Sequence, residues 1–263
     1  MARIQTTMGH IGYLADGEGA AIVFLHGVGS DKTVWAEQIA RFSQHWRAIA
    51  LDYPGYGESD LPDRDLDRPA IAAALWAALD ALGVAQVHLA GLSMGGVLAL
   101  EMRRQQPGRI RTLILADTFA WHPQAEMLVA RSHTAIQQMT MREFAAARVG
   151  GLLAPMATEE SKAAVIRQMG GIDKGTYYWS TLAVWTPDYR ADLAQITQPT
   201  LILVGEHDHV TPPALAEELH AGIAGSRLVV IPAAGHISNL DNPAAFDTAI
   251  TAFLADQTTA SGA

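Results

Sequence analysis

The chain has 263 residues, 49% hydrophobic and 17% charged, and is long enough to bury a large core within one domain. Its 18 basic and 27 acidic residues give a net charge of −9, which argues against nucleic-acid binding through phosphate neutralisation. It has no cysteine, which excludes disulfides, thiolate metal ligands and thiol nucleophiles.

The N-terminal residues 1–10 lack the basic start and the apolar run of a signal peptide. No stretch of the sequence approaches the ~18 consecutive apolar residues that indicate a membrane span. We therefore expect a cytoplasmic protein that does not bind membranes.

Short, nearly continuous apolar runs follow, as expected for strands that are covered on both faces of a parallel sheet. They are residues 21–25, 48–51, 86–90, 112–116, 200–204 and 227–231. Helical patterns lie between and after them, at residues 33–42, 69–82, 94–105, 213–221 and 243–254. This alternation predicts an α/β fold with a mostly parallel, doubly wound sheet, in which ligands bind beyond the C-terminal strand ends.

The alternation breaks once, between residues 120 and 190, where glycines and a proline separate several helical segments. This stretch contains Trp121, Trp179 and Trp185, half of the 6 tryptophans. We expect residues 1–119 and 191–263 to form the core domain, and residues 120–190 to form a helical lid over the strand ends. The three tryptophans are candidates for substrate binding, although a helical lid also needs aromatic side chains for its own core.

A nucleophile motif lies between a predicted strand and a predicted helix. Residues 91–96 read Gly-Leu-Ser-Met-Gly-Gly, which matches the G-x-S-x-G pattern of a nucleophile elbow. Small residues are needed at positions 91 and 95 because the turn is tight and the helix packs against its own strand. The motif predicts Ser93 as a nucleophile; the alternative is a glycine turn with a serine helix cap.

A serine nucleophile needs a base, and in this arrangement the acid and then the base follow the serine along the chain. Among the 10 histidines, His236 lies in a glycine-containing loop after the last core strand, and its position predicts the base. Asp208, which follows the preceding strand, is the predicted acid. Asp117, one strand earlier, is its rival and is otherwise expected to order a loop.

Two further carboxylates, Glu206 and Asp52, are weaker candidates for the acid.

The tetrahedral intermediate also needs two hydrogen-bond donors. We expect these to be the backbone N–H groups of Met94, after the nucleophile, and of Val28, in the glycine-containing loop after the first apolar run. His26 precedes that loop and is expected to brace it.

Five segments together resemble the α/β-hydrolase superfamily over nearly the whole chain: residues 26–29, 52–59, 91–96, 205–208 and 235–236. The elbow and residues 234–243 are most similar to the 3-oxoadipate enol-lactonase group. The resemblance implies an α/β-hydrolase fold and a serine hydrolase. The sequence contains no phosphate-binding loop, dinucleotide motif or metal-ligand spacing, so we expect neither a cofactor nor a metal.

The nucleophile narrows the reaction class. A serine at position 93 disfavours the haloalkane dehalogenases and epoxide hydrolases of the superfamily, which use aspartate. Leu92 stands where the similar carbon–carbon bond hydrolases usually have asparagine. We therefore expect hydrolysis of a small carboxylic ester or lactone through an acyl-enzyme. The alternatives are a lyase or perhydrolase with the same triad, and a ligand-binding receptor on the same fold.

Overall fold

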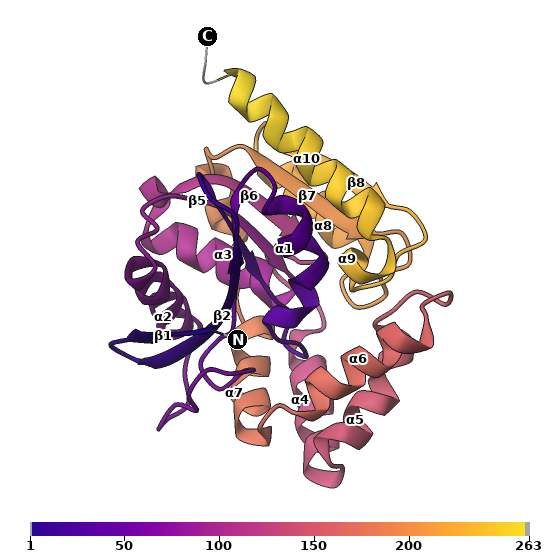
Figure 1. The fold of residues 1–263 in the computed structure, drawn as a ribbon. Helices are drawn as coiled ribbons and strands as arrows, with labels where there is room; N and C mark the ends of the chain where they lie inside the picture. The colour runs from indigo at the N-terminus through magenta and orange to yellow at the C-terminus, as the bar shows by residue number, and fades with distance from the viewer. Residues whose placement is uncertain (1, 261–263) are drawn as a thin grey trace.

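An eight-stranded sheet runs through the molecule (Figure 1), and the computed structural model describes residues 2–260. The strands are β1 (Ala2–Thr6), β2 (Gly9–Asp16), β3 (Ala21–Leu25), β4 (Arg47–Leu51), β5 (Val87–Leu92), β6 (Ile110–Ala116), β7 (Thr200–Gly205) and β8 (Arg227–Ile231). Their order across the sheet is β1-β2-β4-β3-β5-β6-β7-β8. Neighbouring strands from β4 to β8 are parallel, which confirms the predicted α/β class.

Helices connect the strands and cover both faces of the sheet. The α-helices are α1 (Ala36–Phe42), α2 (Arg68–Ala81), α3 (Met94–Gln105), α4 (Ala125–Gln138), α5 (Met141–Arg148), α6 (Glu159–Gly170), α7 (Lys174–Trp185), α8 (Pro213–Gly222), α9 (Ser238–Asp241) and α10 (Pro243–Ala260). Short 3-10 helices are η1 (Lys32–Trp35), η2 (Pro107–Arg109), η3 (Val149–Gly151) and η4 (Arg190–Gln195). Helix α1 packs against α10 on one face, and α2 packs against α3 on the other (Figure 1).

The central strands form the core. Every residue of β3, β5 and β7 is buried, which explains why these strands read as continuous apolar runs in the sequence. The strand β8 lies at the edge of the sheet and is only partly covered. Among residues 2–260, no helix combines the length and the apolar character that crossing a bilayer requires.

The sheet extends further than the sequence analysis predicted. The strands β1 and β2 were not among the predicted ones; they form an antiparallel hairpin that joins the sheet through β4. Their burial alternates or is partial, so they lack the continuous apolar runs that marked the other strands. The predicted helix at 33–42 is also divided, because the 3-10 helix η1 precedes α1.

The segment between β6 and β7 contains helices α4 to α7, which lie together at one end of the sheet (Figure 1). Helix α4 packs against α7, and α5 packs against α6. The break between α4 and α5 was not predicted. It lies at Thr140, whose side chain and that of Glu143 form a capping box at the start of α5.

The register of the parallel strands aligns the ends that carry polar residues. Leu92 at the end of β5 pairs with Ala116 of β6, and Ala116 pairs with Leu203 of β7. The residues after these strands therefore emerge side by side at one edge of the sheet, where the ligand site of such a sheet is expected.

Candidate active site

Ser93 stands on a sharp turn between β5 and α3. Its backbone has φ 55° and ψ −117°, a conformation that is strained for a residue with a side chain. A Cβ on Gly91 would collide with the backbone of Gly95, and one on Gly95 would collide with Leu25. The turn is held by hydrogen bonds from the Ser93 N–H to Ala116 and from the Thr118 hydroxyl to the Ser93 carbonyl. These contacts hold the backbone of Ser93 in its strained conformation.

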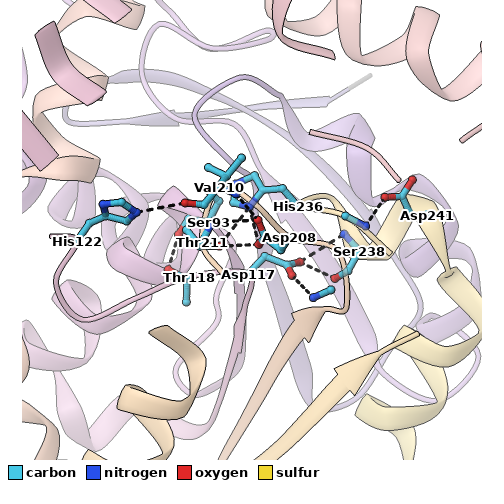
Figure 2. A network of polar contacts seen from close by, with 12 residues as sticks. Ser93, Asp117, Thr118, His122, Asp208, Val210, Thr211, His236, Ser238 and Asp241 are labelled. Atoms are coloured by element: carbon cyan, nitrogen blue, oxygen red, sulfur yellow. Dashed lines mark hydrogen bonds and ion pairs between the residues drawn. The ribbon is translucent and has the colours of Figure 1, made fainter. Parts of the chain in front are cut away.

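The Ser93 hydroxyl is the first member of a hydrogen-bonded series (Figure 2). Its Oγ lies 3.0 Å from His236 Nε2, and His236 Nδ1 lies 2.9 Å from Asp208 Oδ2. All three residues are buried. With the Nδ1 proton donated to the carboxylate, Nε2 is left to accept the serine proton.

The carboxylate of Asp208 is held by its own loop. Its Oδ1 accepts hydrogen bonds from the backbone N–H groups of Val210 and Thr211 at 2.8 and 2.9 Å. The Thr211 hydroxyl donates to Oδ2 at 2.6 Å and lies 3.2 Å from His236 Nδ1. Thr211 was not predicted. Only the turn carried a signal, because an aspartate side chain commonly accepts a hydrogen bond from the backbone N–H two residues further along the chain.

The electrostatics of the pair formed by His236 and Asp208 favour the protonated form of the imidazole. Burial disfavours the charged form of His236, but the charge and the hydrogen bond of Asp208 outweigh this effect and raise the His236 pKa above its usual value. Burial likewise disfavours the Asp208 carboxylate, and here too His236 and the Thr211 hydrogen bonds prevail, so that the Asp208 pKa is lowered. The arrangement stabilises the ion pair that forms when a serine proton moves to His236.

Asp117, the rival acid, contacts other groups (Figure 2). Its carboxylate accepts hydrogen bonds from the Gly205 N–H at 2.8 Å and from the Ser238 hydroxyl at 2.5 Å. Burial, followed by the charge of Asp208, raises the pKa of Asp117 to about 7. The residue therefore ties the end of β7 to the segment that carries His236, without a hydrogen bond to the imidazole.

The two weaker candidates for the acid also lie elsewhere. Glu206 is exposed and accepts a hydrogen bond from the Ala233 N–H at 2.9 Å. Asp52 is fully buried and forms an ion pair with Lys32 at 2.6 Å. Neither carboxylate bonds to His236.

The two expected oxyanion donors are the backbone N–H groups of Val28 and Met94. Within residues 2–260, neither the Val28 N–H nor the Met94 N–H donates a hydrogen bond to a protein acceptor. The loop of Val28 passes close to the nucleophile, since a Cβ built on Gly27 would lie 3.9 Å from Ser93 Oγ. His26 stacks on Tyr53 with ring centroids 4.0 Å apart, as a brace for this loop would.

A narrow cavity of about 40 Å³ opens onto Ser93 and His236. Its walls combine the loop at Val28 with residues of α5, α6 and α7, and they are mostly apolar. This lining suits a small, largely apolar organic molecule.

Only one of the three candidate tryptophans lines the cavity beside Ser93, which corrects the expectation for the other two, although Trp121 and Trp185 share a second groove. Trp185 lines the cavity beside Ser93. Trp179 lines a different groove, because six residues along α7 turn its side chain by about 120° from that of Trp185. Trp121 also lies outside the cavity, and the Arg190 guanidinium covers its ring at 4.1 Å.

Comparisons with known proteins support the fold described above. A family model described as alpha/beta hydrolase fold matches residues 20–243. The 3-oxoadipate enol-lactonase 2 of Acinetobacter baylyi is 28% identical over 237 residues, which cover 89% of this chain and 88% of that protein. The solved enol-lactonase from Burkholderia xenovorans LB400 is 28% identical, with a TM-score of 0.90; the match covers 97% of this chain and 100% of that one.

A third relative is much longer than this chain. The polyketide synthase ThaQ of Burkholderia thailandensis is 31% identical over 257 residues, which are 92% of this chain. The chain spans 12% of the length of that protein, so the likeness concerns one region of a far longer chain.

Proposed function

The chain belongs to the alpha/beta hydrolase fold family, and from this premise we propose that it is a serine hydrolase of small carboxylic esters or lactones. The observation that carries the proposal is the buried hydrogen-bonded series from Ser93 through His236 to Asp208. The similarity to enol-lactonases favours a lactone or a related ester as the substrate.

The proposed reaction follows from the geometry. His236 Nε2 accepts the Ser93 proton while Oγ attacks the substrate carbonyl, and Asp208 stabilises the imidazolium that forms. The N–H groups of Val28 and Met94 bind the developing oxyanion. His236 then donates the proton to the leaving oxygen. Water, deprotonated by the same imidazole, attacks the acyl-enzyme and restores Ser93.

We propose further that residues 120–190 act as the lid of this site and that residues 1–119 and 191–263 form its core domain. Support comes from the cavity, whose walls combine residues of α5, α6 and α7 with the loop at Val28. A lid in this place excludes water and selects substrates.

A covalent probe tests the nucleophile directly. Treatment of the wild-type protein with a fluorophosphonate is expected to give a single adduct, because the activated Ser93 hydroxyl attacks phosphorus as it attacks a carbonyl. The adduct is measured by intact-protein mass spectrometry and located by peptide mapping. Absence of labelling would refute the proposal and favour a binding protein, whereas labelling that survives in Ser93→Ala would show that another residue is the nucleophile.

A second prediction concerns substrate selection by the lid. Trp185→Ala is expected to raise kcat/KM for a bulky lactone relative to p-nitrophenyl acetate by about tenfold, because loss of the indole enlarges the cavity. Trp179→Ala, on the same helix but outside the cavity, is the matched control and is expected to keep the wild-type ratio. Equal ratios for all three proteins would assign substrate selection to other residues.

A further inference from the structure

The cavity wall that α5 and α7 contribute carries two polar side chains without hydrogen-bond partners. Arg148, the last residue of α5, is partly buried and lines the cavity. Within the described part of the chain its guanidinium makes no hydrogen bond. It packs over the Phe144 ring, with 5.4 Å between the guanidinium carbon and the ring centroid. No acidic side chain of residues 2–260 forms an ion pair with it.

Tyr177 also contacts the Phe144 ring. It is 1% exposed, lines the cavity, and packs edge-on against Phe144 with ring centroids 5.2 Å apart. Its hydroxyl has no hydrogen-bond partner among the described residues. Phe144 therefore holds a guanidinium and a phenol hydroxyl against one wall of the cavity.

This pair is close to the triad. Burial is the main influence on the pKa of both His236 and Tyr177, and the charge of Arg148 acts on both in the downward direction. A positive charge that acts on both groups lies within electrostatic reach of the imidazole and of the phenol.

The other polar side chains of the cavity already have partners. The Ser30 hydroxyl donates to Gln168 Oε1 at 3.0 Å, and the Gln168 amide donates to Thr33 at 2.8 Å. Ser93 and His236 bond to each other. The two open donors are therefore those of Arg148 and Tyr177, in a wall that is otherwise mostly apolar.

A cation that is partly removed from water and has no counter-ion destabilises its surroundings, and an anionic ligand that pairs with it removes this penalty. A guanidinium binds a carboxylate through two parallel hydrogen bonds, and a neighbouring hydroxyl donor adds a third. A neutral ester or lactone offers an acceptor oxygen but no negative charge to pair with the guanidinium.

We propose that Arg148 and Tyr177 form a carboxylate subsite, and that the substrates of this enzyme are small esters or lactones that carry a free carboxylate. This inference rests on the proposed hydrolase function and specifies its substrate class. The subsite holds the charged end of the substrate while the reacting carbonyl lies at Ser93.

Matched pairs of substrates test the subsite. On the acyl side, mono-p-nitrophenyl glutarate is compared with p-nitrophenyl valerate, in which a methyl group replaces the carboxylate. On the leaving-group side, p-carboxyphenyl butyrate is compared with p-tolyl butyrate. Wild type is expected to prefer the anionic member of at least one pair.

In Arg148→Met, kcat/KM for the preferred anionic ester is expected to fall about 10- to 100-fold, the usual effect of losing a hydrogen bond to a charged group. Tyr177→Phe is expected to lower it by about threefold to tenfold. The neutral esters should change by less than about threefold. Arg142→Met, an exposed arginine at the other end of α5, is the matched control and should match wild type.

Equal losses on the neutral and anionic members of both pairs, or no loss on either, would overturn the subsite. Its failure is separable from failure of the hydrolase proposal, because neutral esters report hydrolysis without the subsite. If the wild-type protein hydrolyses no ester, calorimetric titration with glutarate decides instead. Binding to wild type that is lost in Arg148→Met supports the subsite, and equal binding or none refutes it.

Discussion

Replacement of Ser93 by alanine is expected to lower kcat on p-nitrophenyl acetate by on the order of 10⁵- to 10⁶-fold, as for other serine nucleophiles that act in a triad. The variant retains the cavity and the oxyanion donors but has no hydroxyl to form the acyl-enzyme. Steady-state kinetics with active-site titration of the wild type measure the effect.

The matched control for this variant is Ser180→Ala. Ser180 is a buried serine of α7 that does not line the cavity, and its removal should leave kcat within about threefold of wild type. Circular dichroism and thermal unfolding verify that both variants fold. Equal rates for wild type and Ser93→Ala would show that another group carries the reaction.

Asp208→Asn is expected to lower kcat by on the order of 10⁴-fold, because the amide no longer holds the imidazole in the tautomer that leaves Nε2 free. It should also move the pH dependence. Asp208 raises the pKa of His236, so the wild-type acid limb of kcat/KM should lie above the usual histidine range. Without the carboxylate that pKa falls, and the residual activity should persist to lower pH.

Asp117→Asn is the control for the acid. Its carboxylate bonds to Gly205 and Ser238 and makes no hydrogen bond to His236, so we expect a loss of less than about tenfold. Full pH profiles of kcat/KM for both variants separate the two roles. A larger loss in Asp117→Asn than in Asp208→Asn would place the acid after β6.

Much of the fold was predictable because strands that are covered on both faces are marked by continuous apolar runs. The strands β3 to β8 were found in this way, and the alternation with helices indicated a parallel sheet. The hairpin of β1 and β2 was missed, since its exposed side chains interrupt the apolar pattern. The capped start of α5 was missed for a similar reason, because a cap is a local signal within a helical stretch.

The sequence by itself determined the parts of the candidate site that depend on local backbone geometry and chain order. The elbow at Ser93 is a local motif, and Asp208 and His236 were selected by the strands that they follow. The tertiary structure decided everything that depends on contacts between distant segments. In the structure Asp208 forms a hydrogen bond with the His236 imidazole, whereas Asp117 accepts one from the Ser238 hydroxyl, although both carboxylates follow neighbouring strands.

The cavity wall was likewise decided by packing alone. Composition singled out three tryptophans, but the rotation of α7 directs Trp185 to the cavity and Trp179 away from it. The proximity of Arg148 to Tyr177 carried no signal, because the two residues are 29 positions apart and are brought together by contacts with Phe144. Helical periodicity relates residues within one helix, whereas the relative orientation of two helices is set by the side chains packed between them.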